Sequence, residues 1–273
     1  MKEKQVLGGQ AVIEGVMMLS QNNLAIAVRK PNNKIAIKKE KLKPLPKILK
    51  LPLIRGIANL IRMMIIGTKA INYSANTSLE QEHQEIKIWE FILTLALSLT
   101  IAITLFKFLP LILANKITET THTNYITFNI LDGIIKIAIF TTFIYLISLT
   151  KDMKKLFQYH GAEHKTVHCQ EAGEKLTTKN VKKYSTLHPR CGTAFILLVL
   201  LTSIIIYTLI PQNYTLTQKL AYRIILLPLI AGIAYELLKI SAKHEKNPLF
   251  KIITWPGIML QKITTKEPNN NVF

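Results

Sequence analysis

Long apolar stretches alternate with polar, strongly basic segments along this chain. Four of the apolar stretches approach the roughly 20 residues that a helix needs to cross a bilayer. They are Phe91–Ala114, Leu131–Thr150, Thr193–Ile210 and Tyr222–Ile240. Asp132 and Lys136 lie four residues apart at the start of the second stretch, so they can pair on one helix face. The pattern predicts an all-α polytopic membrane protein of about four transmembrane helices.

The loops between these stretches differ in charge. The loop 151–192 is rich in lysine, whereas Asn115–Asn129 and Pro211–Ala221 have only Lys116 and Lys219 as basic residues. Cytoplasmic loops carry the excess of Lys and Arg. We therefore expect a protein of the cytoplasmic membrane whose loop 151–192 and both termini are cytoplasmic.

The predicted organisation follows from these stretches. It comprises an N-terminal cytoplasmic segment containing a small β element (1–50), an amphipathic interfacial helix (51–75), a first transmembrane hairpin (88–150), the cytoplasmic loop (151–192), a second transmembrane hairpin (193–240) and a cytoplasmic tail (241–273).

The β element is expected around a turn. Leu24–Arg29 and Lys34–Lys38 are apolar or alternating, and Pro31-Asn32 between them is favourable turn chemistry. Before this hairpin, Val6–Leu19 is apolar and contains adjacent glycines, which indicates tight backbone geometry.

The interfacial helix carries a basic stripe. Arg55, Arg62 and Lys69 fall seven residues apart on the otherwise apolar segment Leu53–Tyr73. Such a helix can lie in the headgroup layer with its stripe toward the phosphates of anionic lipids. The alternative is a helix packed on the protein with the stripe in solvent.

Composition and charge indicate which partners to expect. The chain is 49% hydrophobic yet has a formal net charge of +19. Its lysines are spread over several loops without a recognisable nucleic-acid module, so we expect the lipid bilayer and no nucleic acid as partner. Cys169 and Cys191 do not suggest a disulfide framework, and reduced thiols agree with a cytoplasmic loop.

The cytoplasmic loop contains the motif H-x-x-E-H, formed by His160, Glu163 and His164. On a helix, both imidazoles face the same way and can bind one metal ion. Glu163, beside them, can act as the general base toward water. This is the inverse of the H-E-x-x-H arrangement of zinc proteases.

Further candidate ligands lie nearby. His188 and Cys191 form H-x-x-C before the third apolar stretch, a spacing that suits two ligands on one metal. His168 and Cys169 lie one turn beyond the H-x-x-E-H motif. Glu236 is a carboxylate in the fourth stretch, where burying a charged group costs free energy, so we expect it to have a partner. His168, Cys169 and Glu236 are therefore candidates for an extra ligand or for a group that orients a histidine.

Each candidate also has a plainer interpretation. The histidines can be interfacial polar groups on a basic loop. The segment His188–Gly192 can be a cap and turn with Cys191 as a small apolar filler. Glu236 can form an ion pair with Lys239 or Arg223.

Several longer motifs resemble a known family. They are Gly8–Met18, Leu51–Gly56, Asn72–Ala75, Phe157–Lys165, Ser185–Thr193, Pro228–Leu237 and the segment from Pro256 to Pro268. Across nearly the whole chain, the sequence resembles the YqhQ-like family of bacterial integral membrane proteins, a domain of unknown function. The resemblance implies a metal-dependent enzyme but no substrate.

Two hypotheses follow for function. The first is a metal-dependent membrane hydrolase, with Zn²⁺ as the expected metal, held by His160 and His164 with His188 or Cys191, and with Glu163 as base. Its substrate would be a lipid or a membrane-associated peptide. The second is a non-catalytic membrane scaffold in which four protein ligands close a structural metal site.

Overall fold

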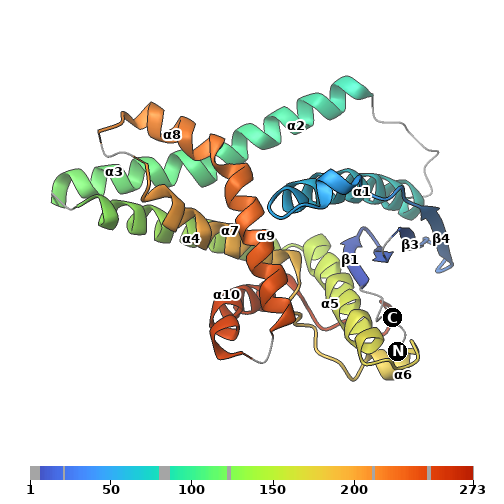
Figure 1. The fold of residues 1–273 in the computed structure, drawn as a ribbon. Coiled ribbons are helices and arrows are strands. Elements are labelled where there is room, and N and C mark those ends of the chain that lie inside the picture. The colour runs from blue at the N-terminus through green and yellow to red at the C-terminus, as the bar shows by residue number, and fades with distance from the viewer. Residues whose placement is uncertain are drawn as a thin grey trace. The chain divides into compact units, whose positions relative to one another are not determined.

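The structure is a computed structural model that describes residues 7–20, 22–79, 87–121, 124–210, 213–244 and 247–272. The chain divides into two compact units, described here one at a time (Figure 1). Unit 1 comprises Met1–Gln84, Leu146–Cys191 and Ile258–Phe273. Unit 2 comprises Glu85–Tyr145 and Gly192–Gly257.

Unit 1 contains a four-stranded antiparallel sheet in the order β1-β2-β3-β4. Its strands are β1 (Leu7–Val12), β2 (Gly15–Ser20), β3 (Asn23–Arg29) and β4 (Ile35–Lys41). The hairpin expected around Pro31-Asn32 is confirmed as β3 and β4. The β element is larger than expected, because the glycine-containing apolar segment before it forms a second hairpin, β1 and β2.

Helix α1 (Ile54–Ser78) packs on one face of this sheet. Met17 and Ile26 of the sheet and Ile66 and Ala70 of the helix belong to one buried cluster. The predicted helix is therefore confirmed, and one face of it is packed on the protein. Its other face exposes apolar side chains, namely Leu60, Ile61, Met64 and Ile65.

Helix α5 (Lys151–Glu171) packs on β1 and β2 and carries the H-x-x-E-H motif. The hydroxyl of Thr150 caps it by accepting a hydrogen bond from Met153 N–H at 3.4 Å. Strand residues alternate between faces, and Gln10 lies against Gly67 of α1 while Gly9 lies against Glu163 of α5. The sheet thus lies between α1 and α5. The short helix α6 (Thr178–Val181) follows, and the last residues of α10 (Pro248–Thr264) complete the unit.

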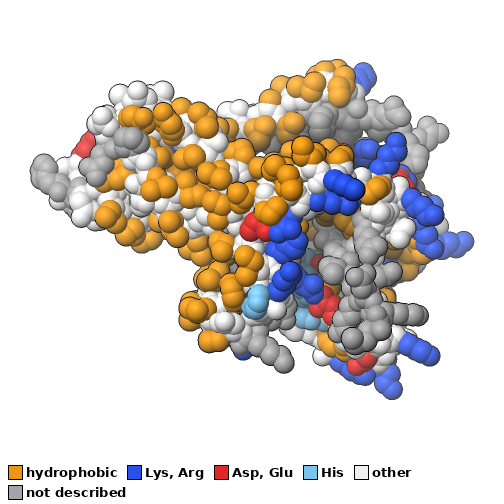
Figure 2. All heavy atoms as spheres, viewed as in Figure 1, with side chains coloured by type: hydrophobic (Ala, Val, Ile, Leu, Met, Phe, Trp, Pro, Cys, Tyr) orange, Lys and Arg blue, Asp and Glu red, His pale blue; other side chains and the backbone are white. Residues whose placement is uncertain are grey.

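Unit 2 is built from apolar helices. They are α2 (Ile88–Ile103), the π-helical turn η2 (Thr104–Phe108), α3 (Leu109–Thr121), α4 (Tyr125–Ser148), α7 (Gly192–Tyr207), α8 (Leu216–Ile225) and α9 (Leu227–Lys243). On the face shown in Figure 2, hydrophobic side chains cover much of α2, α3 and α4. Few Lys and Arg side chains appear over these three helices in the same view.

Among the residues that the structure describes, two helical segments are long and apolar enough to cross a membrane, namely Ile88–Thr121 with 34 residues and Tyr125–Ser148 with 24. A third arises if α8 and α9 count as one span, although they are bent by 47°. The fourth apolar stretch, Tyr222–Ile240, is divided between α8 and α9 at Leu226. Pro228 lies in the first turn of α9 and lacks an N–H for the preceding turn. Helix α7 is apolar but has only 16 residues.

Unit 2 buries a charged cluster among these apolar helices. Asp132 pairs with Lys136 at 3.0 Å, as the spacing predicted, and with Arg223 at 2.8 Å. Arg223 also donates to the Asn129 side chain at 3.1 Å. All three charged side chains are 1% exposed, so the carboxylate compensates two buried cations.

Candidate metal centre

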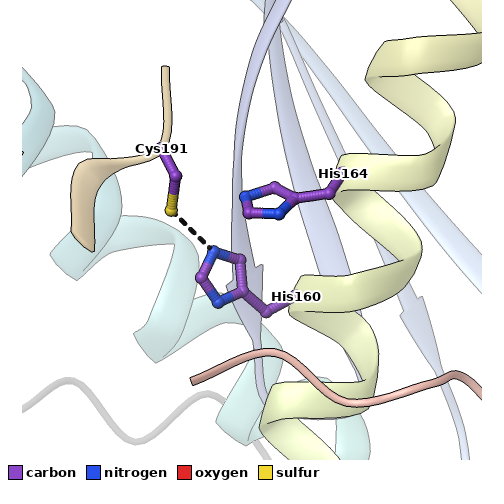
Figure 3. A group of neighbouring side chains, drawn as sticks. All are labelled: His160, His164 and Cys191. Atoms are coloured by element: carbon purple, nitrogen blue, oxygen red, sulfur yellow. Dashed lines mark hydrogen bonds between the residues drawn. The ribbon is translucent and has the colours of Figure 1, made fainter. Parts of the chain in front are cut away.

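Three potential ligands meet on one side of α5 (Figure 3). His160 and His164 project from successive turns of the helix, and Cys191 approaches from the segment that precedes α7. The two imidazole centroids are 4.5 Å apart, and Cys191 Sγ lies 3.3 Å from His160 Nε2. The ligand atoms of the three residues lie within 4.8 Å of one another.

Backbone carbonyls select the tautomer of both histidines. His160 Nδ1 lies 2.8 Å from the carbonyl oxygen of Thr264, and His164 Nδ1 lies 2.5 Å from that of Thr186. Because a carbonyl only accepts, each Nδ1 carries the proton and each Nε2 keeps its lone pair. Histidines that bind metals are oriented in this way, by donating the second ring N–H to a carbonyl or carboxylate.

The donor set fits zinc. Two imidazole nitrogens and one thiolate are ligands that zinc prefers. With Zn–N of about 2.0–2.1 Å and Zn–S of about 2.3 Å, neighbouring ligand atoms of a tetrahedral site lie roughly 3.5 Å apart. The 3.3 Å between Cys191 Sγ and His160 Nε2 is close to this value. Three protein ligands leave a fourth position for a reacting molecule.

Glu163 lies at the edge of this group. Its Oε2 is 3.6 Å from His164 Nε2, and its side chain lies against the backbone of Gly9 in β1. Burial raises the pKa of Glu163 to about 7, although the nearby His160 acts in the opposite direction. A carboxyl group that titrates near neutral pH is suited to accept and return a proton there.

His188 lies in a second group, with His168 and Glu171, rather than in the first. Its Nδ1 accepts a hydrogen bond from Arg190 N–H at 3.2 Å, and its Nε2 lies 3.4 Å from Glu171 Oε2. Burial, with the neighbouring His168 and His164, lowers the pKa of His188 to about 3, so the ring is neutral. Both of its nitrogens are thus engaged in hydrogen bonds.

The other members of this second group are engaged as well. His168 Nε2 donates to the carbonyl of Leu187 at 2.9 Å, and Glu171 forms an ion pair with Arg190. These contacts fasten the segment that carries Cys191 to the end of α5. The second group therefore fits a supporting network better than a metal site.

Residues from the C-terminal part of the chain also shape the centre. Gln261, fully buried, accepts from His188 N–H and donates to His188 C=O, both at 2.8 Å. Lys266 N–H donates to Phe157 C=O at 2.9 Å, and the Lys266 carbonyl lies against Gly161. Sequence reasoning missed Gln261 because it lies about a hundred residues from α5; its only signal was its place in a motif shared with the family.

The remaining candidates lie apart from both groups found among the described residues. Cys169 is buried, with Sγ 3.7 Å from the Lys175 carbonyl, and burial raises the pKa of its thiol. Glu236 lies on α9 of unit 2. Arg62 of the basic stripe donates to the Lys43 carbonyl at 3.1 Å. Arg55 and Lys69 lie on the same helix.

Comparison with known proteins places the chain in an uncharacterised group. The model of a protein family described as "Protein of unknown function (DUF1385)" matches residues 51–273. The chain is also 34% identical to "Uncharacterized protein YqhQ" of Bacillus subtilis (strain 168), over 96% of this chain and 87% of that protein. No solved structure matches the chain.

Proposed function

The chain belongs to the DUF1385 family, and we propose that it is a zinc-dependent hydrolase of the bacterial cytoplasmic membrane, with its site on the cytoplasmic side. The observation that carries this proposal is the convergence of two proton-free Nε2 atoms and one thiol beside a buried carboxyl group.

The residues have separate roles in this proposal. His160, His164 and Cys191 would hold the metal, which would supply Lewis acidity toward water and a substrate carbonyl. Glu163 accepts a proton from the attacking water and returns it to the leaving group. Water adds its hydroxyl to the acyl carbon as the C–O or C–N bond breaks, so the products are an acid and an alcohol or amine.

The membrane assignment rests on the apolar helices and the charge of the loops. We place four spans in the membrane, with the short α7 and the bent α8–α9 pair added to the two long helices. The lysine-rich segment that contains α5 would face the cytoplasm, with both termini. The apolar outer face of α1, with Arg55, Arg62 and Lys69 on the same helix, would lie among anionic headgroups. The substrate would be a lipid or a membrane-associated peptide.

Metal content tests the centre. We expect about one zinc per chain, a stoichiometry that follows from one set of three ligands, in the detergent-purified protein measured by elemental mass spectrometry. His160→Ala and Cys191→Ser should lose the metal. Cys169→Ser is the matched control, because its thiol is also buried but lies outside the ligand group, and it should keep the metal. The assignment would be refuted if the protein holds no zinc after reloading, or if all variants retain zinc equally.

One distance favours a second candidate function. Glu163 lies outside the ligand group, but its Oε2 is 3.6 Å from His164 Nε2, so this carboxylate would be the fourth ligand of a closed structural site in a membrane scaffold. Glu163→Gln separates the two cases. A base can be replaced with little loss of zinc affinity and a large loss of hydrolysis, whereas a ligand cannot be replaced without weakening zinc binding.

A further inference from the structure

A cavity of about 260 Å³ lies in unit 1 beside the candidate metal centre. Its lining comes from the face of the sheet opposite α1, from α5, from residues 176–178 and Val181, and from Val272 near the C-terminus. Positions 159, 162, 163 and 166 of α5 line it. Positions 160 and 164, on the adjacent side of the same helix, belong to the metal-ligand group. The cavity and the metal ligands therefore lie on adjacent sides of α5, and Glu163 borders both.

The wall of the cavity is mostly apolar. Val16 and Met18 of β2 and Ala27 of β3 contribute from the sheet, and Leu176 and Val181 contribute from the segment after α5. Pockets of this kind bind the apolar part of a ligand and use a few polar groups to orient it.

The ionic groups of the cavity wall differ in their interaction partners. Glu14 forms an ion pair with Lys155 and accepts a hydrogen bond from the Tyr159 hydroxyl at 3.3 Å. Arg29 interacts with the same Tyr159. The carboxyl group of Glu163 instead has the metal-ligand group beside it. Glu163 is thus the polar group of the wall that lies beside the metal-ligand group.

We infer that this cavity binds the aliphatic part of an acyl group whose carbonyl is hydrolysed at Glu163. The inference rests on the proposed function and names the substrate class for it. The volume lies just below the roughly 300–1,000 Å³ of pockets for drug-sized ligands, which indicates a short or branched chain rather than a whole diacyl lipid. Such an acyl group occurs in esters of medium-chain acids and in peptides with an aliphatic residue before the cleaved bond.

Alkyl hydroxamates test the inference, because the hydroxamate binds zinc while the alkyl chain probes the cavity. Dissociation constants would be measured by calorimetry on the zinc-loaded, full-length protein in detergent, for the series from acetohydroxamate to octanohydroxamate. Burying one methylene contributes about 0.8 kcal/mol, so affinity should rise about fourfold per carbon until the cavity is filled. Leucine hydroxamate, compared with the linear series, distinguishes a peptide source from a fatty-acyl source.

Two variants of β3 provide the matched comparison. Ala27 lines the cavity, and Ala25, two residues away on the same face of the strand, does not. Ala27→Phe should abolish the gain with chain length and leave the affinity for acetohydroxamate unchanged. Ala25→Phe should preserve the gain. If Ala27→Phe does not fold, Val16→Phe obstructs the same cavity from β2.

The outcomes separate this inference from the proposed function. If acetohydroxamate does not bind to the zinc-loaded protein, the metal-dependent hydrolase is refuted. If acetohydroxamate binds but longer chains gain nothing, or if the gain survives in both cavity variants, the acyl cavity is refuted and the metal centre stands. Partition of the alkyl chains into detergent is common to all variants, so it cannot produce a difference between them.

Discussion

The contact between Gly9 and Glu163 offers a sharp test of the centre, because a single methyl group would disturb it. A Cβ atom added at Gly9 would lie 2.5 Å from Glu163 Cγ, 2.6 Å from Oε1 and 2.8 Å from Cδ. Carbon atoms in good contact lie about 3.5–4.0 Å apart, so the carboxylate or the strand must move by roughly 1 Å. Gly8, the preceding residue of the same strand, has no atom within 4 Å of the corresponding position.

The expected magnitude follows from two opposing effects. Replacing glycine with alanine stabilises a protein by about 0.4–1 kcal/mol through the unfolded chain where the backbone accepts a side chain. Overpacking a well-filled site costs about 1–3 kcal/mol. Gly8→Ala experiences only the first effect and Gly9→Ala experiences both. Gly9→Ala should therefore be about 1–3 kcal/mol less stable than Gly8→Ala, because the common effect cancels.

Thermal unfolding in detergent, followed by circular dichroism, would measure the difference. The decisive comparison repeats both glycine substitutions in a Glu163→Ala background, where the clashing side chain is absent. In that background Gly9→Ala and Gly8→Ala should have the same unfolding midpoint. The coupling energy between positions 9 and 163 then measures the cost of the clash between the added methyl group and the Glu163 side chain. The reasoning is refuted if Gly9→Ala lowers the midpoint equally with and without Glu163.

Two further predictions concern buried hydrogen bonds and charges. Gln261→Leu leaves the N–H and C=O of His188 without their partner, which costs about 1–3 kcal/mol for each group, and should weaken zinc binding about 10–100-fold by loosening the segment that carries Cys191. Competition with a zinc chelator measures this, and unchanged affinity would contradict the role of Gln261. In unit 2, Asp132→Asn leaves Lys136 and Arg223 as uncompensated buried cations and should destabilise the protein by about 3–5 kcal/mol. The exposed Asp152→Asn is the control and should have little effect on the unfolding midpoint; equal shifts for both would contradict the account of the buried cluster.

Local patterns were sufficient for several features of this protein. The i and i+4 spacing of His160 and His164 determines that they share a helix face, because helical geometry depends only on neighbouring residues. The turn at Pro31-Asn32 is determined by its own φ preferences, so the β3–β4 hairpin was predictable. The pairing of Asp132 with Lys136 is likewise local.

The first hairpin and the break before α9 were harder to predict. Strands β1 and β2 are contacted by α1 on one face and by α5 on the other, and such strands lack the clean alternation of a one-sided sheet. The apolar run through Pro228 predicted one helix. In the structure Pro228 lies in the first turn of α9, where it begins a new helix.

The composition of the metal centre depends on tertiary structure. The motif H-x-x-C offered both His188 and Cys191, and only Cys191 joins the histidines of α5 in the first group. The difference arises because Gln261, Arg190 and Glu171 hold His188 by contacts that no local pattern encodes.

The same holds for the orientation of the ligands and the environment of the carboxyl group. The carbonyls of Thr186 and Thr264 select the tautomers of His164 and His160, and the backbone at Gly9 presses on Glu163. The sequence by itself determined which residues can share a helix face or a turn, because those relations extend over a few residues. Only the folded chain decided which of them meet, because that depends on packing between segments up to about 150 residues apart.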